Sequence, residues 1–135
     1  MNDGGRSAGD PSACDQRAGG GSAGDQIRAR APHVLEVYTE TRETVLEGGT
    51  VATELKALCA RYLAGEEVHA RDQRQRAALD WAEAIAWDSE LADDALWRRL
   101  HEQFTEPELV ELGYSIAIML GQQHWLATLG VTERP

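Results

Sequence analysis

The residues best suited to acid–base chemistry lie in one short stretch of the chain, between positions 54 and 72. They are Glu54, Glu66, Glu67, His69 and Asp72. A histidine beside a carboxylate can transfer protons, so His69 and Glu54 form a candidate couple if the polar connection at 65–73 folds back onto the preceding helix. The alternative is a solvated polar loop, because no helical spacing holds these two residues together.

The same stretch does not have the pattern of a metal site. One histidine among scattered carboxylates lacks a recognisable ligand spacing. Glycines 19–21 do not form a phosphate-binding loop, since no Lys-Ser/Thr pair follows them and no strand precedes them. We therefore expect neither a metal nor a cofactor.

A second unusual group is the run QQHW at residues 122–125, late in an apolar segment. Hydrogen-bonding groups beside a tryptophan suit the wall of a ligand pocket. They suit a subunit interface equally well, where polar side chains bond across it. His124 thus joins Glu54 and His69 as a candidate for proton transfer.

The two cysteines, Cys14 and Cys59, indicate no disulfide framework. Cys59 falls on the apolar stripe of a predicted helix, where we expect an ordinary buried thiol. The start of the chain shows no apolar signal region, which favours a cytoplasmic protein. The longest apolar stretch, residues 116–120, is far too short to cross a bilayer.

The net charge of −10 restricts the choice of partners. Four aspartates balance four arginines in residues 1–31, so the remaining residues carry the whole excess. Such a surface repels phosphate backbones and anionic headgroups, so we expect no binding to nucleic acid or membrane. The four tryptophans do not indicate base stacking without a basic stripe beside them.

The elements that position these side chains are predicted to be helices. Residues 1–31 hold 7 of the 13 glycines and little apolar bulk, which predicts a disordered Gly/Ser/Ala-rich tail. Residues 32–135 read as one all-α domain of about five helices. Apolar periodicity and capping residues place them from Pro32 to just before Gly48, from a cap at Thr50 to Gly65, at 74–87, from Asp93 or Asp94 to Phe104, and from 105 to about 129.

The last predicted helix is long and apolar on several faces. It opens with a capping box, Thr105 and Glu108, and has Pro107 in its first turn. One apolar stripe runs along it, but Val110, Ile118, Met119 and Trp125 occupy other sides. A domain this small cannot bury all of that helix alone, so we expect a homo-oligomer.

Three segments together resemble the carboxymuconolactone decarboxylase and alkylhydroperoxidase D-like (AhpD-like) family. They are GTVATELKALCARYL (49–63), RAALDWAEAIAWD (76–88) and LHEQFTEPELVELGYSIAIMLGQQHWLATLGV (100–131). The resemblance covers roughly residues 32–131 and rests on order, spacing and helix character. It implies an all-helical fold and assembly as a trimer or hexamer.

The peroxidase branch of that family uses a glutamate, a Cys-x-x-Cys pair and a histidine. Glu54 matches the glutamate, but Glu66 and His69 stand where the cysteines would be, and Gln73 stands in place of the histidine. Two thiols one helical turn apart are needed to reduce peroxide and resolve the product. We therefore expect no thiol peroxidase activity.

Two functional hypotheses follow from the resemblance. The decarboxylase branch works without a cysteine pair, so the chain could be a divergent enzyme that performs acid–base chemistry on a small organic molecule, using Glu54, His69 or His124. The alternative is a non-catalytic oligomeric scaffold or small-molecule-binding protein that has lost the family active site. Fold alone does not choose between them.

Overall fold

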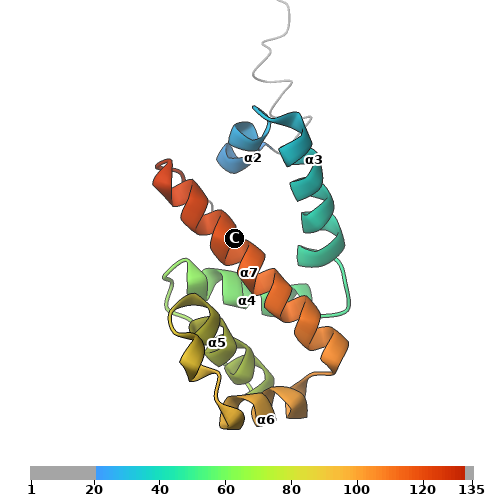
Figure 1. Cartoon of the computed structure of the whole chain (residues 1–135), viewed down its shortest axis with the longest axis vertical. Coiled ribbons are helices and arrows are strands. Elements are labelled where there is room, and N and C mark those ends of the chain that lie inside the picture. The colour runs from blue at the N-terminus through green and yellow to red at the C-terminus, as the bar shows by residue number, and fades with distance from the viewer. Residues whose placement is uncertain (1–20, 133–135) are drawn as a thin grey trace, which may run out of the picture.

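The computed structural model describes residues 21–132, and within them every regular element is helical (Figure 1). Six α-helices and two short helical turns follow one another along this part of the chain. They are α2 (Ala23–Arg28), α3 (Pro32–Thr41), η1 (Arg42–Leu46), α4 (Thr53–Leu63), α5 (Gln73–Ala86), η2 (Ser89–Leu91), α6 (Asp94–Gln103) and α7 (Glu106–Thr128). The prediction of an all-α domain is confirmed for these residues.

Helix α2 lies inside the segment that composition predicted to be a disordered tail, and the structure differs from the prediction there. The Ser22 hydroxyl accepts a hydrogen bond from the Asp25 amide at 3.1 Å and caps the helix. Asp25 and Arg28 are buried and form an ion pair at 2.9 Å. Polar contacts rather than apolar bulk anchor this helix, and a composition argument weighs only the latter. The rest of the predicted tail, residues 1–20, lies outside the described residues.

Helix α3 and the π-helical turn η1 together form the first predicted helix. Pro32 occupies the first turn of α3, where its missing N–H costs nothing. Helix α3 has no buried residue, and Figure 1 shows it standing beside the bundle rather than inside it. The N-terminal helices therefore depend on contacts other than a hydrophobic core.

The loop between η1 and α4 corrects the predicted cap of the second helix. Helix α4 begins at Thr53, and Thr50 lies before it in the loop. There the Glu111 carboxylate accepts hydrogen bonds from the Thr50 and Val51 amides at 2.9 and 2.6 Å. Gly49 has φ +83°, and a Cβ at this position would lie 2.2 Å from Glu111 Oε1. The positive φ favours glycine at position 49, and an added Cβ would also displace the Glu111 carboxylate.

Side chains cap the last three long helices. The predicted starts of α6 and α7 are confirmed, and α5 begins one residue before its predicted start, at a cap that was not predicted. Asp72 and Asp93 accept hydrogen bonds from backbone amides in the first turns of α5 and α6. Thr105 and Glu108 form the complete capping box of α7. Local sequence alone determines these three starts.

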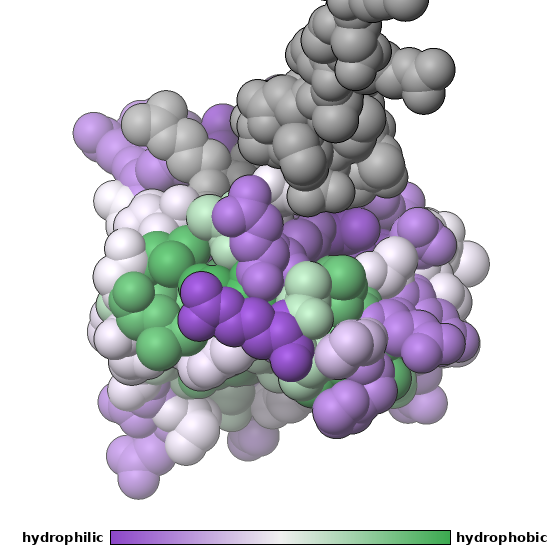
Figure 2. Space-filling view, turned by 90° about the horizontal axis from the view of Figure 1, so that it is seen from above, coloured by the Kyte–Doolittle hydropathy of each residue, from purple (hydrophilic) through white to green (hydrophobic). Residues whose placement is uncertain are grey.

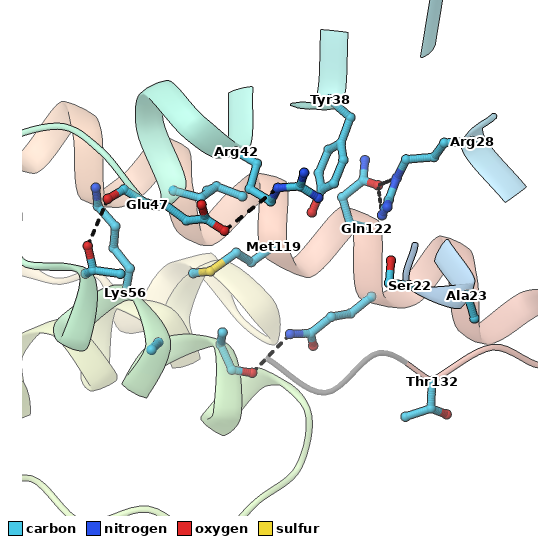
Figure 3. Close-up of a pocket in the computed structure, with 15 residues that line it drawn as sticks. Ser22, Ala23, Arg28, Tyr38, Arg42, Glu47, Lys56, Met119, Gln122 and Thr132 are labelled. Atoms are coloured by element: carbon cyan, nitrogen blue, oxygen red, sulfur yellow. Dashed lines mark hydrogen bonds and ion pairs between the residues drawn. The ribbon is translucent and has the colours of Figure 1, made fainter. Parts of the chain in front are cut away.

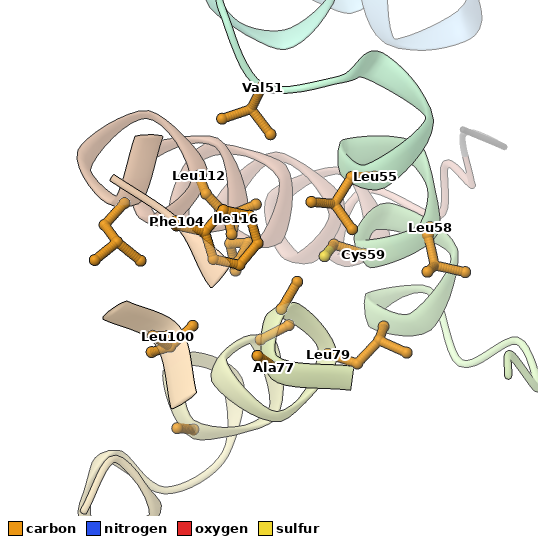
Figure 4. Close-up of a cluster of buried hydrophobic side chains, with 14 of the residues drawn as sticks. Val51, Leu55, Leu58, Cys59, Ala77, Leu79, Leu100, Phe104, Leu112 and Ile116 are labelled. Carbon is orange, nitrogen blue, oxygen red and sulfur yellow. The ribbon is translucent and has the colours of Figure 1, made fainter. Parts of the chain in front are cut away.

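Helices α4, α5, α6 and α7 enclose the hydrophobic core (Figure 4). Leu100, Leu112, Ile116 and Cys59 are completely buried in it. Burial raises the pKa of the Cys59 thiol to about 12, so at neutral pH the sulfur is an unreactive thiol. The interpretation of Cys59 as a core residue is confirmed. Over residues 21–132, no helix is long and apolar enough to cross a membrane.

Candidate functional site

The three residues predicted to transfer protons are placed apart and in solvent. Glu54 is exposed at the start of α4, and His124 is exposed on α7. The His69 side chain is 84% exposed, and its ion-pair contact is with the equally exposed Glu67, 3.7 Å from Nε2 to Oε1. Among the described residues no hydrogen bond or ion pair joins Glu54 to His69, so the structure does not form the predicted couple.

A cavity lies elsewhere in the described part of the chain, between the N-terminal helices and the bundle. It has a volume of about 540 Å³ and is lined by residues of α2, α3, η1, α4 and α7 (Figure 3). Gln122 and Gln123, half of the QQHW run, lie in its wall. The structure thus brings the two glutamines of that run to a pocket and leaves His124 and Trp125 outside its lining.

A buried ion network forms the α2 side of the cavity. The Asp25 carboxylate binds Arg28 through one oxygen at 2.9 Å and Arg42 through the other at 3.1 Å. Arg28 also donates to Gln122 Oε1 from Nε at 3.1 Å and from Nη2 at 2.9 Å. Its guanidinium lies 3.7 Å from the centre of the Tyr38 ring. This network fixes α2 and α3 to α7, in the place of an apolar core.

Lys56 closes the opposite end of the cavity. Its ammonium lies 3.0 Å from Glu111 Oε2 and donates hydrogen bonds to the carbonyls of Val45 and Gly48, the latter at 2.8 Å. These carbonyls belong to the end of η1 and the following turn, where backbone acceptors lack helical partners. The side chain of Lys56 is 1% exposed, so its charge is held for structure and is not offered to solvent.

Arg42 is the cation of the cavity with donors to spare. Burial lowers the pKa of its guanidinium, but the hydrogen bond and charge of Asp25 more than offset this and the pKa is raised. Among the described residues, Nη1 is the only guanidinium nitrogen of Arg42 that makes a hydrogen bond. The contact from Nε to Glu47 Oε1 is long, 3.8 Å, and the Glu47 side chain is 61% exposed. Arg42 can therefore bind a second anion.

Gln123 presents a buried acceptor. Its Nε2 donates to the Ala60 carbonyl at 3.0 Å, and because a carbonyl can only accept, the amide oxygen must face the other way. That oxygen is buried and has no hydrogen-bond partner within residues 21–132. An unsatisfied buried acceptor is costly, which favours a donor supplied by something bound beside it.

No family model, no curated protein and no solved structure matches this chain. Of the predicted site residues Glu54, His69 and His124, none lines the cavity. No cluster of three or more His, Cys, Asp or Glu side chains in the described part of the chain could hold a metal ion.

Sequence reasoning missed the charged residues of the cavity. Arg28 and Arg42 look like ordinary surface cations, and Asp25 falls in a segment set aside as a tail. The available signals were weak: Asp25 and Arg28 have the three-residue spacing of a helical ion pair. Lys56 stands beside Leu55 on the buried side of α4, which is unusual for a lysine.

Proposed function

We propose that this chain is a small-molecule-binding protein whose ligand is a small organic acid with a hydroxyl or amino group. We further propose that it is a divergent, AhpD-like member of the carboxymuconolactone decarboxylase family without thiol peroxidase activity. Support for the family comes from the all-α order and the long capped helix α7. Support for the ligand comes from the cavity.

The observation that carries the proposal is the Arg42 guanidinium in the cavity wall. Its planar set of N–H groups matches a carboxylate in shape and charge. Glu47, the weakly held neighbour, can be displaced because an exposed pair at 3.8 Å contributes little. A ligand carboxylate on Arg42 would gain a charge-assisted hydrogen bond inside a partly enclosed space.

The rest of the cavity suits an organic body. Leu46, Ala57, Ala60 and Met119 supply apolar wall. A ligand hydroxyl or amine would give the buried Gln123 Oε1 the hydrogen bond that it lacks among the described residues, once this side chain turns toward the cavity. A volume of about 540 Å³ lies in the ordinary range of small-ligand pockets. The ligand class is therefore an acid with an apolar centre and one donor.

The same geometry favours binding over acid–base catalysis. A general base must reach the proton that it removes, directly or through one water. Glu54, His69 and His124 are exposed and lie outside the cavity lining. Within the lining, Arg42 and Lys56 are cations held by carboxylates, and the exposed carboxylate there, Glu47, is the group that a ligand acid would displace from Arg42.

Calorimetry with 4-hydroxybenzoate as the probe tests the proposal. We expect measurable binding to the full chain and weaker binding of 4-hydroxybenzamide, which keeps the shape and hydroxyl but lacks the charge. Arg42→Gln should weaken the acid by about tenfold to a hundredfold, the value of a hydrogen bond to a charged group. Arg98→Gln, at an exposed residue outside the cavity, is the matched control and should bind normally. Equal binding to both variants would refute the site.

We also propose that the protein is a homo-oligomer, through the outer face of α7. Tyr114, Ala117, Gly121 and Trp125 are exposed at three- and four-residue steps along this helix. Residues 112–129 contain no Asp, Glu, Lys or Arg although the chain carries a net charge of −10. An uncharged stripe lets two acidic copies meet without repulsion.

Additional apolar surface lies at the end of the molecule that carries α2 and α3, where it is interrupted by hydrophilic side chains (Figure 2). The family resemblance indicates a trimer or hexamer. Light scattering after size exclusion measures the state. We expect Ala117→Glu to dissociate the assembly while Ala95→Glu, at an exposed alanine on α6, leaves it intact. A monomeric parent chain would refute this part of the proposal.

A further inference from the structure

A second site, whose lining shares no residue with the cavity, lies between α5, α6 and α7. It is a groove of about 390 Å³ in which two indole rings and an imidazole stand together. Trp81 and Trp97 meet edge to face, with ring centres 5.5 Å apart and planes at 64°. Trp97 is 37% exposed, so a large aromatic surface faces solvent here.

Helix α7 forms the floor of the groove, and Gly113 in this helix leaves room for the Trp81 ring. A Cβ on Gly113 would lie 2.6 Å from Cη2 of that indole. A glycine inside a helix costs about 1 kcal/mol relative to alanine, and here it lets the ring lie directly against the backbone of α7. The position of Trp81, and with it the aromatic wall, depends on this glycine.

The polar groups of the groove are acceptors. Glu106 lies at the start of α7, but the capping hydrogen bonds there are made by Thr105 and Glu108. In the described part of the chain the Glu106 carboxylate has no hydrogen bond and no ion pair, and no lysine or arginine lines the groove. The groove therefore contains one unpaired negative charge beside two indole rings.

His101 adds a second acceptor. Its Nδ1 lies 2.8 Å from the Trp97 carbonyl oxygen, and since that oxygen can only accept, Nδ1 must carry the hydrogen. In the neutral ring, Nε2 then carries a lone pair that can accept a hydrogen bond. Aromatic faces, a carboxylate and an imidazole lone pair all attract the same kind of group.

We propose that this groove binds a small organic ammonium ion. The cationic head would lie over the indole of Trp97, within reach of Glu106 and of Nε2 of His101. Leu109 and Val110 would cover its apolar part. The net charge of −10 attracts cations to the surface as a whole, and the groove supplies the aromatic contact that makes an organic cation preferred over an inorganic one.

The probe is 2-phenylethylammonium, titrated into the full chain while the indole N–H signals are followed by NMR. We expect the signals of Trp81 and Trp97 to shift and those of Trp87 and Trp125 to stay. The neutral analogue 2-phenylethanol should bind about tenfold more weakly, because it loses both the cation–π contact and the charge pair.

The decisive comparison is between a carboxylate of the groove and a carboxylate outside it. Glu106→Gln should weaken the ammonium probe about threefold to fivefold, the value of an exposed charge pair. Glu66→Gln makes the same change in net charge at an exposed residue outside the groove and should leave the affinity unchanged. Equal affinity for the alcohol, equal loss in both variants, shifts confined to Trp87 and Trp125, or no shift at all would each overturn the proposal.

Discussion

Replacing Asp25 with asparagine tests how the N-terminal helices are held. The carboxylate binds Arg28 and Arg42, one on each oxygen, whereas an amide offers only one oxygen and no charge. The Arg28 side chain is 1% exposed, so Asp25→Asn removes a charged partner from a buried cation.

The magnitude follows from burial. Breaking a buried pair by removing one partner costs about 3–5 kcal/mol. Arg28 keeps its two hydrogen bonds to Gln122 and its contact with Tyr38, which favours the lower end. Arg42, whose side chain is 29% exposed, adds at most about 1 kcal/mol. We expect a total near 3 kcal/mol.

The loss of stability should be confined to the N-terminal helices α2, α3 and η1. No residue of α2, α3 or η1 belongs to the hydrophobic core, so these helices can open while α4–α7 stay folded. Hydrogen exchange should show amide protection in α2 falling about a hundredfold, or to the level of an open chain, with α5 unchanged. Glu36→Gln, at an exposed residue of α3, is the control. Unchanged protection in α2, or an equal loss throughout α5, would refute the reasoning.

Three further predictions concern the bundle. Burial raises the pKa of Glu111, but hydrogen bonds from Thr50 and Val51 and the pairing with Lys56 lower it by more. Its pKa in the folded chain therefore lies below the ordinary 4.5. The ionised Glu111 carboxylate therefore stabilises the fold above pH 4.5, and this stabilisation is lost as the pH falls through the depressed pKa. In acid titrations followed by circular dichroism, Glu111→Gln should lose less stability than the parent. Gly49→Ala should destabilise the fold by about 1–3 kcal/mol in urea, because it adds both backbone strain and a clash; an unchanged midpoint would contradict this. Cys59 should react with a thiol reagent only at the rate at which the chain unfolds, and a fast reaction in the native state would contradict its burial.

The features predictable from sequence were those determined by neighbouring residues. The capping box at Thr105 and Glu108 and the acidic start of α6 need only a few consecutive side chains. The Asp72 cap of α5 is equally local but was not predicted. Thr50 was misassigned because the carboxylate of Glu111, sixty-one positions away, takes its amide. Helix α2 was missed for the same reason, since its partner Gln122 is distant in sequence.

The candidate site was harder to predict than the fold. Glu54 and His69 were grouped because they are close along the chain, but the connection at 65–73 does not return to α4, and both side chains remain in solvent. The run that contains Gln123 was left as either a pocket wall or a subunit interface, because polar groups in an apolar helix need partners. The guanidinium opposite it comes from η1, and only the packing of η1 against α7 brings the two to one cavity.

The most direct test of organic-acid binding is to locate the bound probe. Intermolecular nuclear Overhauser effects from the ring protons of 4-hydroxybenzoate should reach the methyl group of Met119, which lies in the cavity wall between α4 and η1 (Figure 3). Effects that reach only side chains outside this cavity, with none to Met119, would contradict the account.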